Sequence, residues 1–170
     1  MYAEALKLVA SLGARRPAAV LPFRLDQLFQ SLYAPECDAR RLEDQIWELW
    51  MHHPHRRAAQ ALERTASDIA DHLYDVAETR LTQLVRACPD FPEAWNKRAT
   101  LYYLQQRDDE CVHDIQRTLE LEPRHFCAML HFGELCFAGG AAEEGRFAFR
   151  AVLSLHPNLP RARQGVSDKP

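Results

Sequence analysis

The sequence predicts an all-α fold, a right-handed α-solenoid of helix-turn-helix repeats preceded by an N-terminal capping helical pair. The first observation behind this prediction is the segment 92–125, which contains two amphipathic helical patterns around a short polar turn. Apolar residues recur at helical spacing from Trp95 to Tyr103 and again from Cys111 to Leu119. Such a pair has an apolar face that it cannot cover alone, so it needs neighbours of the same shape.

The second observation is that the same pattern returns every 34 residues on both sides of this segment. The recurring positions hold proline, a small residue or a large apolar residue. In three successive units they are Thr65, Ala99 and Gly133; Ile69, Tyr103 and Phe137; Ala77, Cys111 and Gly145; Leu81, Ile115 and Phe149; Leu84, Thr118 and Val152; and Pro89, Pro123 and Pro157. Small residues suit close helix approach and large ones fill the gap between helices. The period therefore predicts three repeats, at 58–91, 92–125 and 126–159.

These residues and their spacing resemble the tetratricopeptide repeat family from about Ala58 to Leu159. The middle unit matches the family's signature positions with Trp95, Ala99, Tyr102, Cys111, Ile115, Thr118 and Pro123. Cysteine stands there where alanine is usual, Met129 replaces tryptophan in the third unit, and Ala61 and Asp68 replace tryptophan and tyrosine in the first. The run WNKRATLYYL is also similar to short, largely uncharacterised tetratricopeptide proteins of bacteria and plant organelles. The resemblance implies a solenoid whose concave side binds another protein.

The composition is that of one globular domain, with 170 residues, 47% of them hydrophobic and 26% charged. The formal net charge of −3 argues against a nucleic-acid-binding solenoid, which usually presents a positive face. Five cysteines without a CxxC pair suit a reducing compartment, so we expect a soluble intracellular, cytoplasmic protein. No run of about 18 apolar residues is present, so we expect no membrane span.

Residues 1–21 are rich in alanine, leucine and basic residues and contain one acid, Glu4. This pattern fits either an organellar targeting segment or a terminal helix broken at Gly13 and Pro17. Both interpretations remain open at the level of sequence.

Residues 22–57 show two short amphipathic patterns and are predicted to form a helical pair. The pair resembles a degenerate fourth repeat, and we expect it to act as a cap that shields the apolar face of the first repeat. Trp47 and Trp50 cannot both enter one interface, so one of them is expected to be exposed. Residues 160–170 have room for a short cap and a polar tail, which predicts an incompletely covered edge on the last repeat.

No catalytic motif is present: the sequence lacks a glycine-rich phosphate loop, a GxSxG elbow and an HExxH pair. We therefore expect no enzymatic activity and no cofactor. Two groups contain possible metal ligands, the run His52, His53 and His55 and the pair Cys127 and His131. A proline interrupts the first, and no second pair completes the other, so we expect no metal.

The family resemblance implies a partner-binding groove on the first helix of each pair. The predicted groove residues are Leu62, Ile69, Asn96, Lys97, Thr100, Tyr103, Leu104, Leu130, His131, Glu134 and Phe137. Chaperone-binding members of the family hold a peptide's terminal carboxylate with basic and amide side chains on this face. At the corresponding positions Lys97 is the single basic residue, so such a clamp is not expected. An apolar or amphipathic segment of another protein fits this lining better.

The sequence thus favours a non-enzymatic adaptor that binds a peptide or helix of a partner protein of unknown identity. One alternative is a self-associating, dimer-forming structural protein, supported by the short C-terminal cap and the two tryptophans. The other is an RNA-binding helical repeat that uses arginines near the first repeat. These arginines are Arg40, Arg41, Arg56, Arg57 and Arg64. The acidic total and the lack of a base-reading pair in each repeat make nucleic acid the weaker expectation.

Overall fold

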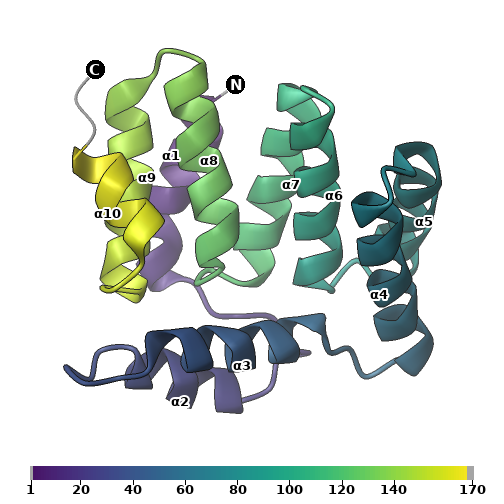
Figure 1. Cartoon of the computed structure of the whole chain (residues 1–170), viewed down its shortest axis with the longest axis horizontal. Helices are drawn as coiled ribbons and strands as arrows, with labels where there is room; N and C mark the ends of the chain where they lie inside the picture. Colours follow the sequence, from purple (N-terminus) through teal and green to yellow (C-terminus); the bar gives the residue numbers. More distant parts are fainter. Residues whose placement is uncertain (1, 168–170) are drawn as a thin grey trace.

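The computed structural model describes residues 2–167, and every regular element in that range is a helix (Figure 1). The predicted right-handed α-solenoid is confirmed. Its three helix pairs are α4 (Arg56–Ala70) with α5 (Tyr74–Ala87), α6 (Pro92–Leu104) with α7 (Asp108–Leu121), and α8 (Phe126–Ala138) with α9 (Ala142–Leu155). The first helices of the pairs lie on one side of the array and the second helices on the other (Figure 1). Helix α10 (Pro160–Ser167) follows the last pair.

The 34-residue period reflects how closely the paired helices approach each other. A Cβ atom built on Gly133 of α8 would lie 2.9 Å from the ring of Phe149 on α9. One built on Gly145 of α9 would lie 2.5 Å from the ring of Phe137. In the middle pair the same two positions hold Ala99 and Cys111, and both are fully buried. The small residues that define the repeat are therefore the points of closest helix contact.

Each repeat turns between its two helices through one residue with left-handed backbone geometry. The φ angles are 59° at His72, 58° at Gln106 and 78° at Gly140, again at a spacing of 34 residues. Glycine adopts this conformation without a steric penalty, whereas at His72 and Gln106 the left-handed backbone costs about 1 kcal/mol of free energy each. The turn geometry is thus set by the stacking of the repeats and not by local sequence alone.

The N-terminal helix α1 (Tyr2–Ser11) is followed by the short 3₁₀ turn η1 (Leu12–Ala14). Helix α1 lies against the side of the solenoid that is formed by the second helices of the pairs. It packs on α7 and α9 and buries Ala5, Leu8 and Val9. The Tyr2 hydroxyl donates a hydrogen bond to the carbonyl oxygen of Leu135, 3.0 Å away. The described part of the segment 1–21 is therefore an integral part of the core.

Helices α2 (Arg24–Ser31) and α3 (Ala39–Met51) do not stack on the first repeat, which differs from the expected cap. They cross the ends of the repeat helices (Figure 1), where α3 contacts α4 and α6. The reason is aromatic packing around Phe126 at the start of α8. Its ring centroid lies 5.1 Å from that of Trp50 and 6.3 Å from that of Phe29. Helices α2 and α3 therefore pack on these aromatic rings. They leave uncovered the face of the first repeat that points away from the second repeat.

The expectation of an exposed tryptophan is wrong for Trp50, which is 1% exposed, and Trp47 is half-buried. The self-association alternative loses this support. Helix α10 also covers more of the last repeat than expected. Its Ala162 and Gly165 are buried, and Gly165 lies so close to Phe149 that a Cβ atom there would be 2.3 Å from the ring. Among residues 2–167, no helix has the length and apolar character needed to cross a membrane.

Candidate partner-binding groove

The concave side of the solenoid is lined by α4, α6 and α8, and the predicted groove residues fall into three classes there. Buried in the packing between helices are Leu62, Asn96 and Leu130. Half-buried are Ile69, Lys97, Thr100, Tyr103, His131, Glu134 and Phe137. Leu104 is 48% exposed. The predicted residues thus lie on α4, α6 and α8, but several of them are buried in the packing between repeats instead of facing solvent.

A cluster of buried polar side chains, here called the Glu93 cluster, occupies the end of the groove where α6 and α8 begin. Glu93 is fully buried and accepts a hydrogen bond from Nε2 of His125 at 2.8 Å. The Asn96 amide donates to both Glu93 oxygens at 3.2 and 3.3 Å, and Nζ of Lys97 lies 3.3 Å from Oε1. The Glu93 cluster joins the second repeat to the third.

The tautomer of His125 follows from its position as the N-cap of α8. Its Nδ1 accepts the backbone N–H of Ala128 at 3.3 Å, so the proton of the neutral ring is on Nε2 and is donated to Glu93. Burial acts to raise the pKa of Glu93, but the hydrogen bond from His125 and the charge of Lys97 outweigh it. The pKa of Glu93 is held below its usual value, and the carboxylate is ionised at neutral pH.

Helix α3 closes this end of the groove. The Trp50 ring stacks on His125 with centroids 4.0 Å apart and planes at 10°, and Nζ of Lys97 lies 4.9 Å from the centroid of Trp47. Lys97 is thus held between Glu93 and an indole ring. Its ammonium group therefore already has a carboxylate partner within the protein.

The other end of the groove, where α6 and α8 finish, stays open. The rings of Tyr103 and His131 are parallel, with centroids 5.8 Å apart, and Leu104 next to them is exposed. Phe137 stacks on Phe149 at 5.6 Å. Beside it, a hollow of about 360 Å³ lies between α8, α9 and α10. Its lining consists of Glu134, Phe137, Phe149, Arg161, Gln164 and Gly165. The open part of the groove therefore combines aromatic and aliphatic side chains with the ion pair between Glu134 and Arg161.

Comparisons with known proteins agree with this geometry. The chain is 29% identical over 87 residues to a TPR repeat-containing protein of Rhizobium etli, a match that covers 51% of this chain and 43% of that protein. The first TPR domain of Spaghetti (RPAP3), bound to an HSP90 peptide, superposes with a TM-score of 0.61 at 24% identity and covers 64% of this chain and 86% of that one. The chain has the fold and the repeat pattern of tetratricopeptide repeat proteins.

Two further comparisons concern parts of the chain. Residues 56–111 match a family described as a family of unknown function, DUF6584, and this range runs from α4 into α7. The type III secretion chaperone SycD of Yersinia enterocolitica, in complex with a peptide of the translocator YopD, superposes with a TM-score of 0.59 at 12% identity. That match covers 63% of this chain and 87% of the chaperone. The chain spans about half the length of the curated relatives it matches.

The possible metal ligands do not come together in this protein. Within residues 2–167, no three His, Cys, Asp or Glu side chains are arranged to hold a metal ion. His53 is buried, and its ring packs on Phe91 with centroids 4.6 Å apart. Burial raises the pKa of the Cys127 thiol, so Cys127 behaves as a small apolar residue at neutral pH. All five cysteines are free.

The arginines considered for RNA binding do not form one patch. Arg40 and Arg41 lie at the start of α3, whereas Arg56, Arg57 and Arg64 lie on α4, which begins beyond the other end of α3. Helix α3 has 13 residues and so separates the two groups by about 20 Å. Neither group presents the continuous positive surface that phosphate binding requires.

Replacing His131 with phenylalanine is expected to reduce the loss of stability between pH 6.5 and pH 4. Burial, followed by the charges of Arg161 and His125, lowers the pKa of His131 from 6.5 to about 4; Lys97 adds to this effect and Glu93 opposes it. The unfolded chain therefore binds a proton first, and the stability that is complete above pH 6.5 falls as the pH drops towards 4. Because part of the ring meets solvent, we expect an effect of about 1–2 kcal/mol.

The measurement is the free energy of unfolding in urea at pH 7.5 and 4.5, for the wild type and His131→Phe. Other groups titrate in both proteins, so the difference between them isolates His131. Equal losses in the two proteins would contradict the assignment.

Proposed function

We propose that this protein is a non-enzymatic adaptor that binds a segment of another protein in the open part of its concave groove. The observation that carries the proposal is the exposed apolar surface of Leu104 at the end of α6, next to Tyr103 and away from the Glu93 cluster where α6 begins. Two structural neighbours support this kind of role, because RPAP3 and SycD were each solved with a peptide of another protein.

The chemistry of the groove favours an apolar or amphipathic segment. Its closed end has an ionised carboxylate, Glu93, that is already satisfied by Lys97 and His125. At its open end His131 is neutral at physiological pH, because burial lowers its pKa to about 4. Glu134 at this end is paired with Arg161, and the exposed Leu104 and the aromatic rings let a partner gain affinity by burying its own apolar side chains there.

Leu104→Glu is the variant that tests the groove with least risk to folding. Phe137 would be a poor choice, because it fills the space left by Gly145 and stacks on Phe149. A charge at position 104 stays in solvent in the free protein but must be desolvated when a partner covers it. We expect partner binding to weaken by a factor of about 10 or more.

Phe23→Glu is the matched control, since Phe23 is 75% exposed and lies before α2, which is not one of the helices that line the groove. Proteins captured from a native extract by wild type, Leu104→Glu and Phe23→Glu would be compared by quantitative mass spectrometry. A set of proteins retained by wild type and Phe23→Glu but depleted with Leu104→Glu supports the groove. Equal retention by all three folded proteins would remove the open groove as the binding site.

A further inference from the structure

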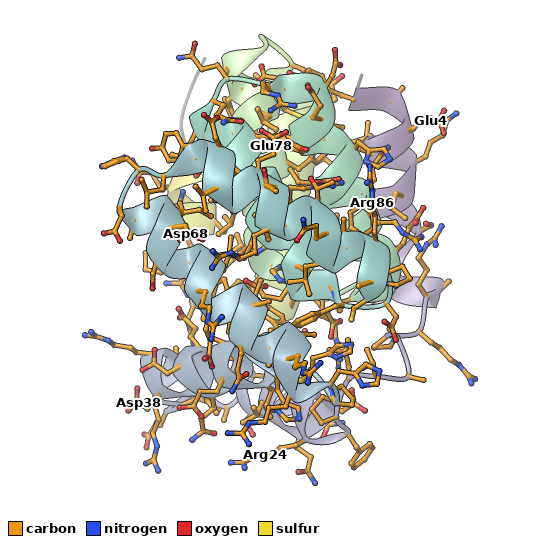
Figure 2. All side chains as sticks on the ribbon, turned by 90° about the vertical axis from the view of Figure 1, so that its right-hand side faces the viewer. Glu4, Arg24, Asp38, Asp68, Glu78 and Arg86 are labelled. Carbon is orange, nitrogen blue, oxygen red and sulfur yellow. The ribbon has the colours of Figure 1, made fainter. Side chains whose placement is uncertain are left out.

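The outer face of the first repeat, formed by α4 and α5, is a second uncovered surface. Figure 2 views the molecule from this end: α4 and α5 face the reader and bear the labels Asp68, Glu78 and Arg86. Helices α2 and α3, marked by Arg24 and Asp38, lie below them in this view. In the other two repeats the equivalent face is covered, because α5 packs on α6 and α7 packs on α8.

This outer face contains a hollow beside Ala61, a position that holds a larger side chain in each of the neighbouring repeats. The hollow measures about 300 Å³ and has mostly apolar walls that include Ala58, Ala61, Leu84 and Ala87. The position of Ala61 corresponds to Trp95 in the second repeat and Met129 in the third, which is fully buried. A second hollow, of about 410 Å³, lies along α5 and is lined by Asp75, Val76, Thr79, Arg80 and Gln83; Val76 is 45% exposed. The surface is thus shaped to accept large apolar side chains from outside.

The charges around the hollow are positive where α4 begins. This helix has no acid in its own first turn and starts with Arg56 and Arg57, although the N-terminal end of a helix is itself positive. By contrast, the repeat helices α5, α6, α7 and α9 each have an acid in the first turn. Within residues 2–167, the side chain of the N-cap His55 makes no capping hydrogen bond, and Arg57 has no ion-pair partner.

We propose that this outer face binds an α-helix of a partner protein that has an apolar stripe flanked by acidic residues. One large side chain of that helix fills the hollow over Ala58 and Ala61. Its carboxylates meet Arg57 and the uncapped N-terminus of α4. Arg80 contributes less, because it already pairs with Asp68 at 3.3 Å.

A second copy of this chain fits the outer face less well than an acidic partner helix does. The opposite end of the solenoid is α10, whose residues 160–167 contain no acid and two arginines, Arg163 and Arg161, of which Arg161 pairs with Glu134. Stacking that end on α4 and α5 would place basic residues against basic residues, and two outer faces meeting each other would oppose their Arg57 side chains. The charge pattern therefore selects an acidic helix from another protein.

The test uses a fluorescein-labelled, stapled helical peptide with a leucine stripe flanked by glutamates, and a second peptide in which lysines replace the glutamates. Fluorescence anisotropy should show saturable binding of the acidic peptide and at least about tenfold weaker binding of the basic one. Ala61→Trp, which copies the second repeat, should fill the hollow and weaken binding of the acidic peptide by at least about tenfold. Arg57→Glu should weaken it by about five- to tenfold.

Arg24→Glu is the matched charge control and Leu104→Glu the control for the concave groove; both should leave the affinity unchanged. Absence of saturable binding by the acidic peptide, equal binding of the two peptides, or unchanged binding by folded Ala61→Trp would overturn the proposal. Sedimentation would be run alongside. Concentration-dependent dimers that Ala61→Trp abolishes would assign the face to a second copy and overturn the partner-helix proposal as well.

Discussion

Arg98→Phe is expected to destabilise the protein by about 3–5 kcal/mol, a large share of the free energy of unfolding of a domain of this size. Arg98 on α6 holds the buried carboxylate of Asp114 on α7 through two hydrogen bonds of 2.6 and 2.9 Å. Asp114 is fully buried, so removal of the guanidinium takes away its only permanent cationic partner among residues 2–167 and leaves it the exposed His113 ring, whose Nδ1 lies 3.1 Å from Oδ1. Urea unfolding followed by circular dichroism measures the loss.

The third repeat suggests a variant that separates the effect of the buried charge from the effect of the changed side-chain shape. At the positions equivalent to Arg98 and Asp114 it has Phe132 and Ala148, and both are fully buried. The double variant Arg98→Phe/Asp114→Ala copies this apolar pair and should recover most of the stability lost by Arg98→Phe. Arg117→Ala is the control, because Arg117 pairs with Glu120 at the surface and should contribute less than about 1 kcal/mol. A double variant as unstable as Arg98→Phe would show that the charge is not the cause.

The repeats could be predicted from the sequence because the same contacts between helices recur in each of them. Small residues such as Gly133 and Gly145 recur where helices touch, and a regular spacing of such residues needs no knowledge of the rest of the fold. The left-handed turn residues His72 and Gln106 could not be predicted in this way. Neither position has glycine, the residue type that indicates such a turn at Gly140.

The place of α2 and α3 could not be predicted, because an amphipathic pattern shows that a face is buried but not against which surface. Their site depends on the aromatic ring of Phe126, far away in the sequence, and on ion pairs such as that between Asp26 and Arg124. The Glu93 cluster was missed for a related reason. In sequence, Glu93 follows Pro92 at the start of a helix, where an acid is ordinary. Its partner His125 lies 32 residues away, and the contact becomes apparent only when the repeats are stacked.

Trp50→Ala is expected to cost about 3–5 kcal/mol and to loosen α2 and α3 from the solenoid. The Trp50 ring is 1% exposed and lies between His125, Phe126 and Phe29, with centroid distances of 4.0, 5.1 and 6.1 Å. Its removal leaves a cavity at the joint between the helical pair and the third repeat. Hydrogen exchange should therefore quicken in α2 and α3 more than in α6 to α9.

Trp47→Ala provides the comparison, because Trp47 is the same residue type one turn earlier on α3. It is half-buried, and its main contact with the groove is the ammonium group of Lys97 at 4.9 Å from the ring centroid. We expect a loss of about 1 kcal/mol, from the cation–π contact and partial burial. Equal losses for the two variants would mean that α3 is held by its whole surface. A larger loss for Trp50→Ala, with exchange quickened mainly in α2 and α3, would identify Trp50 as the anchor that closes one end of the groove.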